Sequence, residues 1–201
     1  GLPDEQFEIK PEPAPSVGSI SPESDMQDVA ADSILRLTLA SPNRGMRELS
    51  AEISPKTELV MTESTDDTVF GWKAKGLLEQ GKEHELKIFD KRSGSQEPIA
   101  EVTFTTASEP KVKATSKGFM YPDVPIDITF DMPMKREGDV VQCACDGRGE
   151  WKTDTVYQFV PRNLDVDKTY EQSVLQGVRS AKGGILEEDH TFKLKTPGAV
   201  K

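Results

Sequence analysis

The residues in this sequence that most invite a chemical role are its only two cysteines, Cys143 and Cys145. A structural zinc site needs four ligands, and the chain adds only two histidines, His84 and His190. A disulfide across one residue fits an extended strand poorly, because side chains on the same face are spaced too widely for a bridge. Since Val141, Cys143 and Cys145 alternate, we expect both thiols to line a core as small apolar groups. A redox or disulfide role and a metal role are the alternatives.

The histidines do not carry the pattern of a catalytic centre. A triad needs a nucleophile, a base and an orienting acid held together. The Gly-x-Ser-x-Gly elbow does not occur in the chain. We therefore predict no catalytic residue, no cofactor site and no metal ligand, and we do not expect an enzyme. The acidic stretches Asp66-Asp67 and Asp165-Val166-Asp167 are interpreted as turns, because calcium needs six to eight converging oxygens; calcium binding stays open.

Trp72 and Trp151 are the candidates for a ligand-binding surface. Exposed to solvent, their rings would form a platform on which a carbohydrate stacks. The alternation of Phe70 with Trp72, and of Tyr157 with Phe159, instead favours one inward face in each pair. We therefore expect core packing, with ligand binding as the alternative.

Length and charge bound the class of protein. The chain has 201 residues, of which 35% are hydrophobic and 30% are charged, as in a globular protein. Its formal charge of −10 argues against nucleic-acid binding. Residues 1–109 carry 11 basic and 21 acidic residues (11 − 21 = −10), whereas residues 110–201 carry 14 of each. No apolar run is long enough to span a membrane, and the first residues do not read as a signal peptide.

Hydrophobic residues alternate with polar ones along most of the chain. This period of two is typical of half-buried strands, and no long segment shows a helical period. The sequence therefore predicts an all-β protein. The expected strands are 35–39, 49–53, 68–72, 83–89, 101–105, 126–130, 140–145, 155–160, 169–175 and 191–195.

The two halves of the chain resemble each other. Asp32–Leu39 matches Asp123–Phe130, and later strands match at offsets of about 90 residues, which indicates tandem modules. About seven short strands in each module predict a β-sandwich. We place a proline-rich linker at residues 1–15, a first sandwich domain at 16–107 and a second at 108–198. Two such modules would form a rod that holds its neighbours apart.

One spacing sharpens the fold prediction. Leu164 precedes Tyr170 by six residues at the start of a strand. This spacing is characteristic of the tyrosine corner of immunoglobulin-like and fibronectin-like sandwiches, in which the hydroxyl bonds back to loop backbone. Leu164 and Tyr170 are therefore assigned structural roles. In the first repeat, Leu78 precedes His84, so a histidine stands where the tyrosine would be.

On these residues the chain resembles tandem bacterial immunoglobulin-like domains of the Big_5 type. The resemblance rests on the Ser21-Pro22 turn, the strand Asp123–Phe130, the leucine-to-tyrosine corner and the closing Phe104–Thr106 pattern. Leu39-Ala40-Ser41 and His84 depart from it. The resemblance implies a secreted or cell-envelope protein of bacterial type.

The function implied by this resemblance is a non-catalytic spacer or adhesion module. Its expected partners are other domains of the same polypeptide, and cell-wall glycan or a surface protein. No nucleic acid and no direct membrane insertion are expected. The alternative is an accessory region of a cell-wall or polysaccharide-active enzyme whose catalytic domain lies elsewhere.

Overall fold

A computed structural model describes residues 15–42, 48–65, 67–92 and 95–198. Within these ranges the chain forms strands and no helix, so none of the described segments is a helix that could cross a membrane. The strands are β1 (Val17–Ser21), β2 (Met26–Val29), β3 (Leu35–Leu39), β4 (Leu49–Ser54), β5 (Leu59–Thr65), β6 (Val69–Ala74), β7 (Glu83–Asp90), β8 (Ala100–Thr106), β9 (Val112–Thr115), β10 (Ile126–Phe130), β11 (Val141–Cys143), β12 (Asp146–Trp151), β13 (Val156–Arg162), β14 (Thr169–Val174) and β15 (His190–Lys195).

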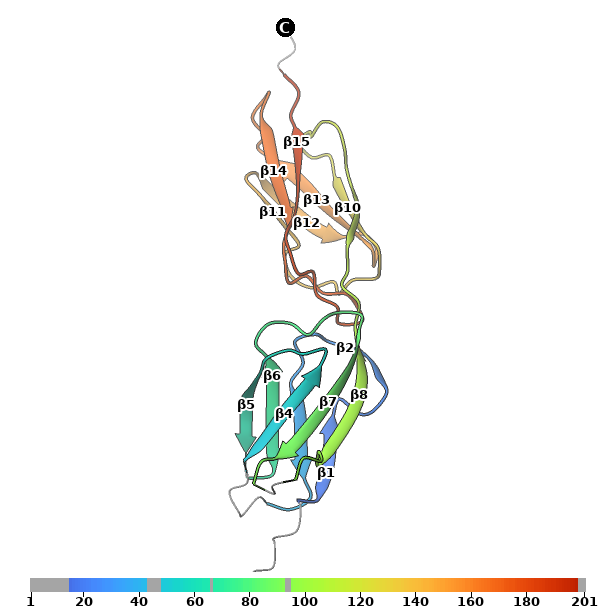
Figure 1. The fold of residues 1–201 in the computed structure, drawn as a ribbon. Helices are drawn as coiled ribbons and strands as arrows, with labels where there is room; N and C mark the ends of the chain where they lie inside the picture. Colours follow the sequence, from blue (N-terminus) through green and yellow to red (C-terminus); the bar gives the residue numbers. More distant parts are fainter. Residues whose placement is uncertain (1–14, 43–47, 66, 93–94, 199–201) are drawn as a thin grey trace, which may run out of the picture. The chain divides into compact units, whose positions relative to one another are not determined.

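These strands form four sheets (Figure 1). Residues 17–106 supply the orders β1-β3-β6-β5 and β2-β8-β7-β4, which we call the first sandwich. Residues 112–195 supply β12-β13-β10-β9 and β11-β14-β15, which we call the second sandwich. Neighbouring strands are antiparallel except for β2 and β8, which run parallel. The chain is thus an all-β protein built of immunoglobulin-like sandwiches. The alternation predicted the all-β class, and the number of strands in each repeat predicted the sandwiches.

The described residues divide into two compact units whose boundaries differ from those of the sheets. One compact unit contains residues 25–33, 76–84 and 104–198, and the other contains the remaining described residues. The boundaries expected at residues 107 and 108 therefore stay a prediction. All but the last residue of the expected linker at 1–15 lies outside the described residues.

The ten strands expected from alternation all occur, with their ends shifted by no more than about two residues. Five further strands were not predicted, and all five lie at sheet edges: β1, β2, β5, β9 and β12. An edge strand has only one hydrogen-bonded neighbour, and these five bury few side chains. In β2 only Val29 is buried, and in β9 no residue is, so neither strand shows an alternating inward face. Without an inward face there is no period of two for the sequence to display.

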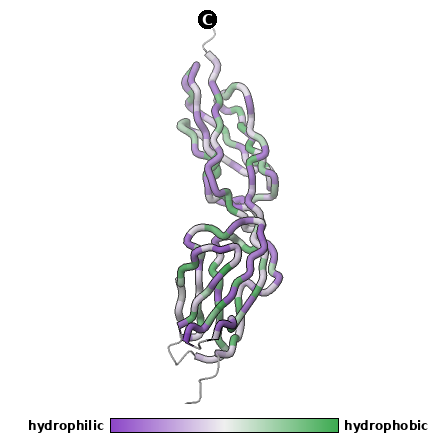
Figure 2. Tube along the Cα trace, in the orientation of Figure 1, coloured by the Kyte–Doolittle hydropathy of each residue, from purple (hydrophilic) through white to green (hydrophobic). Residues whose placement is uncertain are grey.

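The core of the second sandwich comes from the inward residues of its central strands. Ile126, Ile128 and Phe130 of β10 are all buried, and Asp127 and Thr129 between them are not. Apolar and polar residues are interspersed along the chain in both sandwiches (Figure 2). Each inward side chain removes apolar surface from water, which is the main favourable contribution to folding.

Two glycines let the edge strand β12 accept aromatic rings from β13. A Cβ atom on Gly149 would collide with the hydroxyl end of Tyr157, and one on Gly147 would collide with the ring of Phe159. Tyr157 and Phe159 are both buried. Their rings therefore cover the backbone where β12 has no side chains, which closes this side of the core.

This packing makes β12 sensitive to a single methyl group. We expect Gly149→Ala to lower the free energy of unfolding by about 1–3 kcal/mol, because the new Cβ displaces the Tyr157 ring. Gly76→Ala is the control, because no atom lies within 4 Å of its Cβ position. Urea denaturation measures both. Equal stability of the two variants would contradict the ring-over-glycine packing.

Candidate functional site

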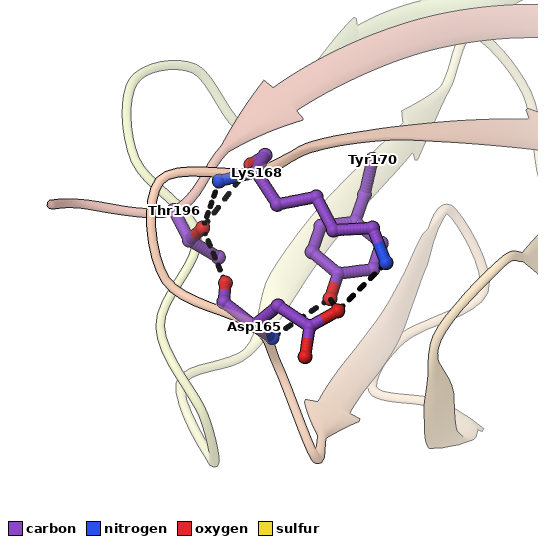
Figure 3. Close-up of polar contacts among 4 residues, drawn as sticks. All are labelled: Asp165, Lys168, Tyr170 and Thr196. Atoms are coloured by element: carbon purple, nitrogen blue, oxygen red, sulfur yellow. Dashed lines mark hydrogen bonds and ion pairs between the residues drawn. The ribbon is translucent and has the colours of Figure 1, made fainter.

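The loop before β14 is held by Tyr170 (Figure 3). Its ring is buried, and its hydroxyl accepts a 2.8 Å hydrogen bond from the backbone N–H of Asp165. Leu164, next to that N–H, packs against the second core. The structure therefore contains the tyrosine corner that the spacing of Leu164 and Tyr170 indicated.

Thr196 completes this corner from the end of the last strand. Its hydroxyl donates to the carbonyl of Asp165 at 2.6 Å and accepts from the backbone N–H of Lys168 at 2.9 Å. The Lys168 ammonium lies 2.7 Å from an Asp165 carboxylate oxygen and 4.9 Å from the centre of the Tyr170 ring (Figure 3). The loop backbone thus has protein partners although it crosses between the sheets.

The ion pair at this corner shifts two titrations. The hydrogen bond from Lys168, with its charge, lowers the pKa of Asp165 below its ordinary value, and the same contact raises the pKa of Lys168. A lowered carboxyl pKa gives stability that is present above the ordinary pKa and is lost as pH falls through the lowered one. Both side chains are more than half exposed, so solvent screens the pair and its contribution is small.

The first sandwich builds the same corner with a histidine. His84 is fully buried, and its Nε2 lies 2.9 Å from the carbonyl oxygen of Glu79. The Thr106 hydroxyl donates to the same carbonyl at 2.7 Å and accepts from the backbone N–H of Lys82 at 3.2 Å. The ring of His84 stacks on Phe104, with 5.5 Å between centroids. Because Nε2 faces an acceptor, it carries the proton, and Nδ1 has no partner among the described residues.

The tyrosine corner makes a quantitative prediction. We expect Tyr170→Phe to lower the free energy of unfolding by about 0.5–1.5 kcal/mol, because the Asp165 N–H loses its acceptor while the ring packing stays. Tyr121→Phe removes a hydroxyl from a side chain that is 44% exposed, so it should leave stability unchanged. Thermal or urea unfolding of the two variants tests this; a neutral Tyr170→Phe would contradict the proposed role of the hydroxyl.

The structure corrects the prediction for Cys143 and Cys145. They are not free thiols lining the core: their sulfur atoms are joined in a disulfide, and both residues are half-buried at the edge of the second core. The expectation assumed an extended strand through both cysteines. Instead β11 ends at Cys143, the chain bends at residues 144–145, and β12 begins at Asp146. The bend brings the two Cα atoms to 5.1 Å, within the range that a disulfide spans.

Two surface hollows meet at this disulfide. One, of 270 Å³, lies between β11 and β12, and the rings of Tyr157 and Phe159 form part of its wall together with Asp139, Val141, Gln142, Cys143, Cys145, Gly147 and Gly149. The other, of 310 Å³, is lined by Gln142, Cys143, Ala144, Glu171 and Ser173. Both cysteines line the first hollow, and Cys143 also lines the second. Burial raises the pKa of the Tyr157 hydroxyl in the first hollow.

Neither tryptophan forms an open stacking platform. Trp72 is only 3% exposed, because its position in β6 faces inward with Phe70. Trp151 is half-buried, and its ring packs against Phe130 and Tyr157 at centroid distances of 5.7 and 5.3 Å. The ligand-binding alternative for Trp72 is therefore wrong, and the expected core packing describes both residues.

Among the described residues, the exposed aromatic side chains lie elsewhere, in the loop between β9 and β10. Phe119 is 58% exposed and Tyr121 is 44% exposed, whereas Met120 between them is buried. Phe119 forms a bridge with Lys195, whose ammonium lies 2.7 Å from Asp167, beside the 66% exposed Val166. The alternation of Phe119, Met120 and Tyr121 could have indicated this placement, but a single buried position does not reveal which side faces solvent.

Metal-ligating side chains do not gather in the part of the chain that the structure describes. No group of three or more His, Cys, Asp or Glu residues occurs there. His84 is buried in its corner, and His190 is exposed at the start of β15. Asp66 lies outside the described residues.

No family model and no curated protein matches the chain, so the Big_5 resemblance stays a prediction. Solved structures do resemble it. L,D-transpeptidase 1 of Mycobacterium tuberculosis matches 68% of this chain at 13% identity and a TM-score of 0.33, and this chain spans only 62% of its length. Titin-A168169 matches at 10% identity over 93% of this chain and 97% of that chain, with a TM-score of 0.31. The adhesin InvE of Yersinia pseudotuberculosis matches at 10% identity over 88% and 57%, with a TM-score of 0.31. At these identities the function has to be argued from the chain itself.

Proposed function

We propose that this chain is a non-catalytic module of an exported protein, in which its sandwiches act as a spacer and present a surface to a partner. The observation that carries the proposal is the Cys143–Cys145 disulfide. Disulfides form and persist in oxidising compartments such as the periplasm and the cell exterior. An extracellular or cell-envelope location accounts for the bond.

The corner hydrogen bonds support the spacer part of the proposal. Tyr170 and Thr196 fix the loop before β14, and His84 and Thr106 fix the loop before β7. A spacer needs sandwiches whose crossing loops keep their shape. In both sandwiches these loops are bonded to the strands rather than left to solvent.

The proposal predicts the oxidation state of the cysteines. The chain is produced with and without an export signal, and free thiols are alkylated in intact cells before mass spectrometry. We expect the exported chain to remain unlabelled and the cytosolic chain to be labelled at Cys143 and Cys145. Small-angle scattering of the purified chain then tests the spacer role, for which the sandwiches should stay apart in solution. Free thiols in the exported chain, or a single compact particle, would count against the proposal.

The exposed side chains of the β9–β10 loop favour a second function, a glycan-facing surface within the accessory region of a cell-wall or polysaccharide-active enzyme. Phe119 and Tyr121 present aromatic surface to solvent, and Val166 adds exposed apolar surface. Large apolar side chains that gather on a surface mark interaction sites more often than isolated ones do.

A pull-down with insoluble cell-wall glycan tests this second function. We expect the chain to sediment with the glycan, and Phe119→Ser and Tyr121→Ser each to reduce the bound fraction several-fold through loss of aromatic contact. Val60→Ser is the matched control, since Val60 is 46% exposed in β5 of the first sandwich. Equal binding by all variants, or no binding by the unmodified chain, would rule out this surface.

A further inference from the structure

The disulfide of the second sandwich has the placement of a reactive bond. Both sulfur-bearing residues are half-buried, and each lines at least one of the two hollows. A structural disulfide is usually closed off from solvent, whereas exposed bonds are the labile or regulatory ones. A small molecule in the hollow between β11 and β12 meets both cysteines, because both line it.

This disulfide would add little to the stability of the fold. A disulfide stabilises mainly by closing a loop in the unfolded chain, and the effect grows with loop length. Cys143 and Cys145 are separated by one residue, so the loop is close to the shortest that can be closed. The strands on either side are already held by their ladders: β11 pairs with β14, and β12 pairs with β13.

A buried amide beside the bond has a hydrogen-bonding site left open. Gln172 is fully buried, and its Oε1 has no partner among the described residues, whereas its Nε2 contacts the sulfur of Met120 at 3.1 Å. Cys143 and Gln172 are directly opposed in the β11–β14 register, so their side chains are neighbours on one face. A Cys143 thiol has a proton to donate to Oε1, and the disulfide has none. The reduced form would thus bring a hydrogen-bond donor to the face that holds the open Oε1 of Gln172.

The charged side chains that line the two hollows are acidic. Asp139 lines the first and Glu171 lines the second, and neither has a lysine or arginine among its lining residues. The Glu171 carboxylate is partly compensated by Lys193 at 3.2 Å, at a well-exposed pair. Asp139 therefore supplies the clearer negative field, and it also acts on the Tyr157 hydroxyl. An approaching anion is disfavoured there, and a cation is favoured.

We propose that Cys143–Cys145 is a reversible thiol–disulfide exchange site for small neutral or cationic thiols. A thiolate attacks one sulfur of the bridge, the S–S bond breaks, and its electron pair stays on the other cysteine as a thiolate. A second thiol attacks the mixed disulfide and releases the external disulfide. Two external thiols are thereby oxidised to one disulfide, and their two protons end on Cys143 and Cys145.

The first test compares thiols of different charge. The oxidised, folded 201-residue chain is treated with cysteamine, 2-mercaptoethanol and 2-mercaptoethanesulfonate, and mixed disulfides and free thiols are followed by mass spectrometry. Each rate is divided by that of the same thiol with a small model disulfide. We expect cysteamine to react several-fold faster than the sulfonate on this scale at low salt, with the difference shrinking in salt. Asp139→Asn should narrow the difference, and Glu52→Gln, at an exposed site in β4, should not.

The second test measures the equilibrium. Removing the open acceptor by Gln172→Leu should raise the equilibrium constant for forming the disulfide about three- to tenfold, because the thiol form loses its hydrogen bond. Gln176→Leu, at an exposed position, is the matched control. Circular dichroism confirms folding of each variant, and the thiol-charge comparison remains decisive if Gln172→Leu does not fold.

Two results would overturn the proposal. One is a bridge that reacts only as fast as the chain unfolds globally, because the bond would then be closed to thiols in the folded state. The other is a set of normalised rates that is the same for all three thiols and for Asp139→Asn. Export and the spacer role would be untouched by either result, since they depend on where the bond forms and not on its exchange.

Discussion

Backbone N–H and C=O groups in the loops that cross between sheets must find hydrogen-bond partners. Both sandwiches depend on the side chains that supply these partners. In the second sandwich the Tyr170 hydroxyl takes the N–H of Asp165, and Thr196 takes its carbonyl. In the first, His84 and Thr106 share the carbonyl of Glu79. The phenol accepts a hydrogen bond from a backbone N–H here, whereas the imidazole donates one to a backbone carbonyl, so the two side chains satisfy opposite backbone groups at matching positions.

On its β11–β12 side, the second sandwich is covered by aromatic rings and carries a disulfide. Aromatic rings from β13 lie over Gly147 and Gly149, and Trp151 of β12 packs against Tyr157 beside them. The disulfide joins the end of β11 to the start of β12 across the bend. This side therefore holds two hollows with a disulfide beside them, while the rest of the core is filled by inward residues of the strands.

The aromatic residues differ in burial, and therefore in what they can do. Trp72 and Trp151 pack their large rings against the cores, where such rings contribute most to stability. Phe119 and Tyr121 remain in solvent on a loop, where they add nothing to a core. Interaction surfaces on a sandwich are expected on such loops, because loops vary without disturbing the sheets.

The sequence by itself determined the all-β class, the ten alternating strands and the tyrosine corner, because each depends on spacing along one segment. It did not reveal the five edge strands, which bury few side chains and so display little alternation. Only the tertiary structure decided the state of Cys143 and Cys145. Their pairing depends on a bend that the alternation of Val141, Cys143 and Cys145 conceals. Likewise, only the tertiary structure places Gln172 opposite Cys143, because β11 and β14, some thirty residues apart, pair in one register.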